Sequence, residues 1–332
     1  MADDEQTPVN LSRSVDLLLR ARAQFASPPL EDELFAPLTE VVSTLSEPFI
    51  EIGKAFRANI DGLLSTVSIP YRLAYTSSFN AHWQRIRLAE GIRSLKLTPE
   101  PDETDEALEL RREEHALAIA RPKMDSFVRS LEGQELLLAD TVGFLESLRS
   151  DESLVEAANE LILQGVVLCW GAFEVLARDS FIAHLNASPV RTLTLLADPV
   201  AKRRFELSKV SLETLAANGF NLSARMGNLL AEQQDLSDVL SIKAAYEALF
   251  PANFEVRDAL NDPDLRILSL RRNLIVHRRG IIDATYAASA NCAQQQGLRL
   301  KISPDDLDVH LRTVSLTAAR ILRAASRQTA TT

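Results

Sequence analysis

Three side chains in the last quarter of the chain have the types and spacing for phosphate chemistry. Arg272, Asn273 and His277 stand in the run Arg-Asn-Leu-Ile-Val-His. On a helix, Asn273 and His277 fall about 100° and about 140° from Arg272, so the three side chains share one face. Arginine is a permanent cation that can grip phosphate oxygens, and histidine exchanges protons near neutral pH. The pattern indicates a phosphate-handling site.

The helix that must position this face has readable ends. Asp262 is a suitable N-cap, Pro263 suits the first helical position, and Gly280 is expected to stop the helix. Its spacing also predicts one apolar side that faces a core. The residues on that side are Leu265, Leu268, Ile275 and Val276.

The same stretch allows a plainer interpretation. Residues 265–282 carry no carboxylate, and their basic residues are Arg266, Arg271, Arg272, Arg278 and Arg279. These arginines could merely balance the negative end of the helix dipole, with His277 as a polar cap. A basic patch of this kind could instead bind a phosphate backbone, and Arg266, Arg271 and Arg279 are then the expected RNA contacts.

Around this helix the chain resembles a known family. Arg272-Asn273 and His277, followed by Gly280-Ile281-Ile282-Asp283 and Tyr286, resemble the signature end of HEPN domains, and the RiboL-PSP-HEPN subgroup in particular. Upstream, Trp170-Gly-Ala-Phe-Glu-Val-Leu176 is similar to the first core helix of that family. Residues 297–307 lead into a last helix, as they do in the subgroup. The resemblance covers residues 150–326 approximately.

The resemblance implies a metal-independent endoribonuclease that needs no cofactor. In such an enzyme a ribose 2′-hydroxyl attacks the adjacent phosphate, with Arg272, Asn273 and His277 as catalytic residues. The family also implies a homodimer in which two such helices form one composite site. A toxin or anti-phage defence effector is the expected role, with RNA as substrate and an antitoxin or regulatory protein as a further partner. The alternatives are a HEPN-like module that binds RNA or a nucleotide without cutting it, and a helical scaffold for a protein partner.

Composition narrows the remaining classes. The net charge is −10 and the excess of acid lies in residues 1–150, so general affinity for nucleic acid is not expected. The histidines and two cysteines show no metal-ligand spacing, and so few cysteines suit a reducing cytoplasm. No leader pattern opens the chain, and the apolar run 161–176 is interrupted by Gln164 and Glu174, so no membrane span is expected. Glu174 is expected to support the site by pairing with an arginine of residues 271–279.

Helical periodicity runs through nearly the whole chain and predicts an all-α fold, a helical bundle with a C-terminal HEPN-like domain. Residues 1–9 are expected to be disordered, and residues 96–104 form a linker rich in proline and acid. The expected regions are an N-terminal helical region (1–103), a long helical connector or arm interrupted at Pro122 (104–150), and the HEPN-like domain (151–326). The connector could form a dimer contact or pack on the N-terminal helices. The alternating run 298–302 is the one strand signal.

Overall fold

A computed structural model describes residues 31–206, 210–217, 219–233 and 236–327. This part contains 15 helices and essentially no strands, which confirms the predicted all-α fold. The strand signal at residues 298–302 corresponds to an isolated antiparallel bridge between Ile281 and Arg299. The disorder expected for residues 1–9 concerns residues outside the described part.

The described chain divides into two compact units. The core unit comprises residues 31–67 and 159–327, and the inserted unit comprises residues 68–158. This division differs from the boundaries expected after residues 103 and 150. The reason is that α2 (Glu31–Val42) and α3 (Phe49–Val67) pack with α16 (Pro304–Arg327), far away in sequence. At Gly53 of α3, a Cβ atom would come within 2.6 Å of Val42 and 3.5 Å of Leu322, so the three helices meet there.

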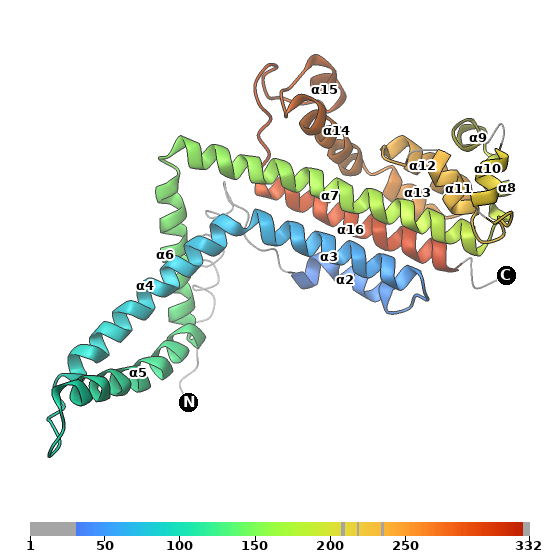
Figure 1. The fold of residues 1–332 in the computed structure, drawn as a ribbon. Coiled ribbons are helices and arrows are strands. Elements are labelled where there is room, and N and C mark those ends of the chain that lie inside the picture. Colours follow the sequence, from blue (N-terminus) through green and yellow to red (C-terminus); the bar gives the residue numbers. More distant parts are fainter. Residues whose placement is uncertain (1–30, 207–209, 218, 234–235, 328–332) are drawn as a thin grey trace, which may run out of the picture. The chain divides into compact units, whose positions relative to one another are not determined.

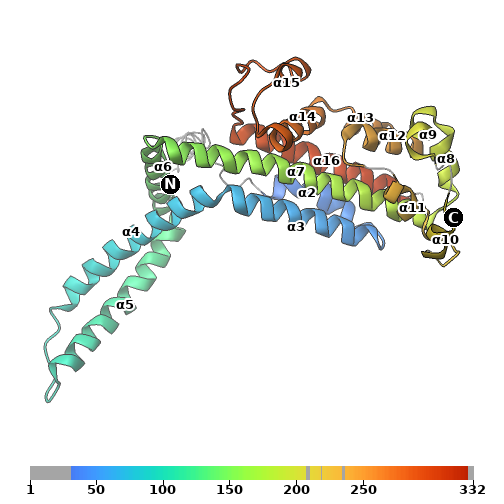
Figure 2. The same ribbon diagram turned by 45° about the horizontal axis from the view of Figure 1, so that its top comes forward.

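The core unit is built around two long helices that lie side by side, α16 and the part of α7 (Glu152–Ala187) that begins at residue 159. In both views α2 and α3 lie on one side of this pair, and α12, α13 and α14 lie on the other (Figures 1 and 2). The remaining helices of the unit are α8 (Arg191–Ala197), α9 (Pro199–Phe205), α10 (Leu212–Ala217), α11 (Met226–Gln233), α12 (Val239–Leu249), α13 (Phe254–Leu260), α14 (Pro263–Arg278) and α15 (Ala284–Ser289).

Helix α7 is the apolar centre of the core unit. Trp170, Phe173 and Phe181 are fully buried, and the Tyr246 hydroxyl of α12 donates a hydrogen bond of 2.6 Å to the carbonyl of Ala177. By length and composition alone, α7 would also qualify as a membrane-crossing helix. That indication is weak, because core helices pass the same test, and more than half of its apolar stretch is buried by other helices. Cys169 is buried in α7, whereas Cys292, in the loop after α15, is half-buried; both are free thiols.

The inserted unit consists of α4 (Ile69–Ser94), α5 (Asp105–Arg129), α6 (Leu131–Leu148) and the first turns of α7. Both α5 and α6 pack on α4, so within this unit the connector expected at residues 104–150 is no isolated arm. Pro122 lies inside α5, and the predicted interruption there is wrong. The break comes instead at Ser130, whose hydroxyl accepts a hydrogen bond from the Gly133 amide and thereby caps α6.

Candidate functional site on helix α14

The ends of α14 follow from the residues that the sequence marked. The Asp262 side chain accepts a hydrogen bond of 2.8 Å from the Asp264 amide, and Pro263 is the first helical residue. At the other end the backbone is left-handed at both Arg279 (φ 54°) and Gly280 (φ 74°), and the Gly280 amide bonds back to Leu274. The helix therefore stops one residue before the expected glycine.

The buried side of α14 differs from the predicted one at two positions. Leu265, Leu268 and Ile275 are buried, as expected, whereas Val276 is 49% exposed. Val276 therefore lies on the solvent side, between Arg272 and His277 on the helix surface. Leu274 is buried as well, so the buried surface of α14 is not the predicted one: it loses Val276 and gains Leu274.

Arg272 is held from two sides. One of its terminal nitrogens donates to Asn273 Oδ1 at 3.0 Å, and the other lies 3.5 Å from Glu174 Oε2 on α7. The same Glu174 oxygen accepts a hydrogen bond of 3.1 Å from the indole nitrogen of Trp170, which is buried. Glu174 thus pairs with an arginine of residues 271–279, as expected, and the rigid indole fixes the carboxylate that fixes the guanidinium.

His277 is exposed in the last turn of α14. Asn273 lies one turn before it and on the same side of the helix. No hydrogen bond joins the two side chains within the described part of the chain, and Asn273 Oδ1 accepts from Arg272 instead. In this single copy Asn273 therefore contacts Arg272 and not the imidazole. The structure places Arg272, Asn273 and His277 on one face but leaves the imidazole unheld.

Arg271 has a different role from its neighbour. It points to α16, where it donates to Asp306 at 3.0 Å and to Nε2 of the buried His310 at 2.8 Å. Arginine only donates, so Nε2 of His310 must accept and the imidazole is neutral. Burial, aided by the charge of Arg271, lowers the pKa of His310 to about 4. The guanidinium of Arg271 is thus tied to α16, and the RNA contact expected there stays a prediction.

Asp306 joins the Arg271 network to the start of α16. It exchanges hydrogen bonds with Ser303, whose hydroxyl accepts from the Asp306 amide at 3.1 Å and donates to its carboxylate at 2.6 Å. Burial alone would raise the pKa of Asp306, but the bonds from Ser303 and the charge of Arg271 lower it. Ser303 therefore caps α16, and the same bonds hold the carboxylate that pairs with Arg271.

The other two predicted RNA contacts are exposed. Arg266 lies near the start of α14, and Arg279 lies at its end. Arg279 lines an open pocket of about 520 Å³ together with Glu160, Gln164, Ile275, Ile281 and Arg299. Arg272, Asn273 and His277 do not line this pocket. The pocket with Arg279 is therefore separate from the face that carries these three residues.

The loop after α14 returns to the helix end through backbone hydrogen bonds. The Leu300 amide donates to the Gly280 carbonyl at 2.8 Å, and the amides of Ile282 and Gly297 bond across the same two segments. These bonds close the loop that holds α15 and Cys292, and they fix Ile281 and Arg299 side by side at the pocket.

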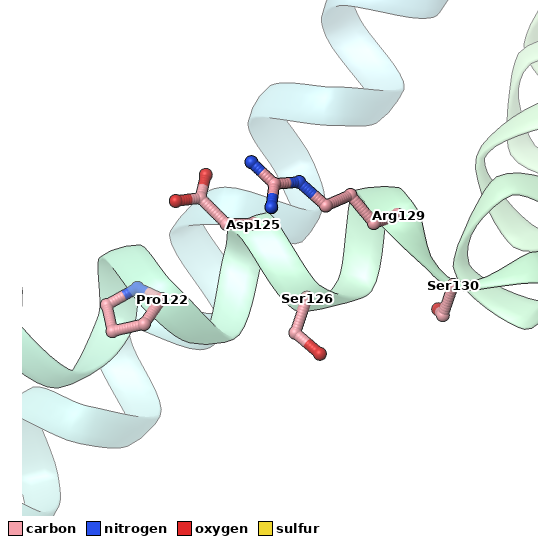
Figure 3. A pocket seen from close by; sticks show the side chains of 5 residues that line it. All are labelled: Pro122, Asp125, Ser126, Arg129 and Ser130. Carbon is pink, nitrogen blue, oxygen red and sulfur yellow. The ribbon is translucent and has the colours of Figure 1, made fainter.

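A second pocket, of about 580 Å³, lies in the inserted unit along α5 and the start of α6 (Figure 3). Asp125 and Arg129 point to one side of α5 there, whereas Ser126 and Ser130 point to the other. This shallow surface contains none of the predicted residues. Among the described residues, no group of three or more histidine, cysteine or acidic side chains could hold a metal ion.

Sequence reasoning missed the partners of the two central arginines. Trp170 and Glu174 are spaced one helical turn apart, which was a usable signal for a shared hydrogen bond. His310 is fully buried, because its position on the strongly amphipathic α16 faces inward. No family model, curated protein or solved structure matches this chain, so the HEPN resemblance stays a prediction from the sequence.

Proposed function

We propose that the protein is a metal-independent endoribonuclease that acts as a homodimer. The observation that carries the proposal is the guanidinium of Arg272, fixed by Glu174 and Asn273 beside the exposed His277. Only one hydrogen on each terminal nitrogen is used, so further N–H groups remain to grip a phosphate. A charge held in place before the substrate arrives stabilises a developing negative charge most effectively.

The proposed reaction needs two proton transfers. The ribose 2′-oxygen attacks the neighbouring phosphorus and loses its proton to one His277, while the bond from phosphorus to the 5′-oxygen breaks. The leaving oxygen takes a proton from a second imidazole, and Arg272 stabilises the extra charge on the phosphate oxygens. The products are a 2′,3′-cyclic phosphate and a 5′-hydroxyl.

One copy of the chain supplies only one His277, so the second imidazole is proposed to come from a second copy. Exposed apolar side chains beside the site support this association: Leu168 and Val175 on α7 and Val276 on α14 are all nearly half-exposed. Gly171 lies between Leu168 and Val175 on the exposed line of α7, and a Cβ there would meet nothing within 4 Å. A second helix could therefore approach closely. A protein partner of another kind would use the same surface.

The second candidate is RNA or nucleotide binding without cleavage. It is favoured by the imidazole of His277, for which the described residues provide no hydrogen-bond partner that would fix its orientation. In the dimer such a partner would come from the second copy. Without a dimer, the basic face would bind phosphate groups but lack an oriented proton carrier.

The deciding experiment is cleavage of a labelled RNA in EDTA by the wild type and by His277→Ala. The wild type should cut and leave a 2′,3′-cyclic phosphate, and the variant should lose about 10²–10⁴-fold in rate. His115→Ala, which removes an exposed histidine from the inserted unit, is the matched control and should cut normally. Equal cleavage by His277→Ala would refute the nuclease, and binding of uncut RNA by the wild type would establish the second candidate.

A further inference from the structure

The pocket at the end of α14 has the size and lining of a ligand site. Its volume of about 520 Å³ lies within the range of small-molecule pockets, and it can hold one nucleotide. It belongs entirely to the core unit. Two isoleucines give it an apolar wall, with Ile275 almost fully buried and Ile281 on the bridge to Arg299.

The charges of the pocket leave one cation available. Glu160 accepts from Arg299 through one carboxylate oxygen and from the Gln164 amide, at 3.1 Å, through the other. Its charge is thereby balanced by Arg299. Arg279 has no ion pair with any described residue, so the pocket keeps a net positive charge that favours an anion.

The backbone at Arg279 offers an independent indication. Its φ of 54° and ψ of 30° are left-handed, a conformation that costs an arginine free energy but costs glycine almost none. Strained residues of this kind concentrate at ligand clamps and other functional sites. A helix end needs only a glycine at this position, so the side chain held there at a cost points to a use for the guanidinium.

Polar groups on the α7 side match the edge of a base. The Gln164 amide nitrogen is used by Glu160, which directs the amide oxygen as an acceptor for an exocyclic amino group. Arg299, which pairs with Glu160 and lines the pocket, offers a guanidinium plane on which a base can stack. An amino-bearing base such as adenine or cytosine therefore fits better than uracil.

We propose that this pocket binds one nucleotide unit, with its phosphate on Arg279 and its base between Ile275, Ile281 and Arg299. If the nucleotide unit is part of a bound RNA, this proposal rests on the proposed nuclease function and names a second contact for its substrate. The same chemistry is present in a free nucleoside monophosphate. The pocket then serves as a subsite at the end of α14, where Arg279 follows His277 by two residues and Arg272 by seven.

Calorimetric titration of the full chain with AMP, UMP and inorganic phosphate tests the pocket. AMP should bind several-fold more tightly than UMP and at least tenfold more tightly than phosphate. Arg279→Gly should weaken AMP at least tenfold while the melting temperature stays equal or rises, because glycine accepts the left-handed backbone without strain. Arg278→Ala removes the neighbouring exposed arginine, which does not line the pocket, and should bind AMP normally. No AMP binding, or equal binding by Arg279→Gly, overturns the proposal.

Competition identifies the source of the nucleotide. AMP should displace a short oligoribonucleotide from the wild type, which supports a subsite for RNA; AMP binding without displacement would overturn the subsite. The His277→Ala variant separates this inference from the proposed function. If that variant binds AMP but does not cut RNA, both proposals hold, and if the wild type binds AMP without ever cutting RNA, only the nuclease fails. Cleavage by a wild type that does not bind AMP would instead remove only the pocket.

Discussion

The core unit and the inserted unit are both helical, but they are packed very differently. The core unit contains a group of fully buried aromatic side chains, among them Phe35, Phe56, Trp170, Phe173 and Tyr246. In the described part of the inserted unit, the largest fully buried side chains are the leucines Leu137 and Leu145, and one cluster is built from Ala74, Val142, Leu145 and Ala158.

The two units support their charged side chains in different ways. Arg272 is positioned through Glu174 by an indole that packs in the aromatic core, whereas the inserted unit contains a buried carboxylate with exposed partners. There, Glu90 is buried but paired with the largely exposed Arg93 and Lys123, and the hydrogen bond from Lys123 lowers the pKa of its carboxyl. Rigid support of a functional side chain comes from locked neighbours, and the core unit supplies them.

The largest expected effect is the loss of folding when the segment that carries α2 and α3 is deleted. Deletion of residues 1–67 takes α2 and α3 away from α16 and exposes a core that contained Phe35, Phe49 and Phe56. Each such side chain contributes about 1.5–3 kcal/mol on burial, so the loss approaches the whole stability of a domain. Circular dichroism and gel filtration should show an unfolded or aggregated chain.

The matched deletion removes the inserted unit instead. Val67 lies against Gly165, and residue 159 is about 9 Å further along α7, so a flexible linker of about six residues can replace residues 68–158. This shortened chain should keep a cooperative melting transition. Aggregation of the shortened chain would show that the core unit does not fold without the inserted unit.

The next largest effect concerns two neighbouring arginines. Arg272→Ala should slow RNA cleavage by about 10²–10³-fold with little change in stability, and Arg272→Lys should also be poor, because a point charge lacks a bidentate grip. Arg271→Ala should instead lower the free energy of unfolding by about 2–3 kcal/mol, since it leaves Asp306 and His310 without their partner. Kinetics and urea unfolding measure the two effects.

Arg111→Ala is the control from the inserted unit. Arg111 pairs with Glu103 at 2.7 Å, so this change also breaks an ion pair, but cleavage should not change. If Arg111→Ala slowed the reaction as much as Arg272→Ala, the site would not belong to the core unit alone.

A smaller effect is expected from acid. His310 has a pKa of about 4 in the folded chain and a reference value near 6.5 when unfolded, so the unfolded state binds more protons between these values. Stability is complete above pH 6.5 and falls by at most about 3 kcal/mol as the pH drops to 4. His310→Gln, which keeps an acceptor for Arg271, should flatten this part of the profile in urea unfolding. His115→Gln in the inserted unit should leave it unchanged, and an unaltered slope in His310→Gln would contradict the assignment.

The smallest effect should appear in association. Gly171→Leu places a side chain where nothing lies within 4 Å, so it should not disturb the fold but should weaken a dimer about tenfold in sedimentation experiments. Gly143→Leu in α6 of the inserted unit adds a side chain in equally open space and should not affect association. A monomeric wild type would remove the composite site altogether.

Residue spacing and charge predicted many local features of this structure, but not the contacts between segments that are distant in sequence. The start of α14 and the pairing of Glu174 with an arginine of residues 271–279 followed from spacing and charge. The division into units did not, because only the fold shows that α2 and α3 cover α16. Arg271 and Arg272 are equal in sequence terms, and a helix turns their side chains about 100° apart, toward two different neighbours.

The closed loop between Ile281 and Arg299 has a practical consequence for spectroscopy. It carries Cys292, which is half-buried, while the chain's other cysteine, Cys169, lies in the core, where burial raises the pKa of its thiol. A maleimide fluorophore should therefore attach at Cys292 without any engineered cysteine. Backbone hydrogen bonds tie both ends of this loop to the proposed nucleotide pocket. The fluorescence of the label should therefore change when a nucleotide binds there.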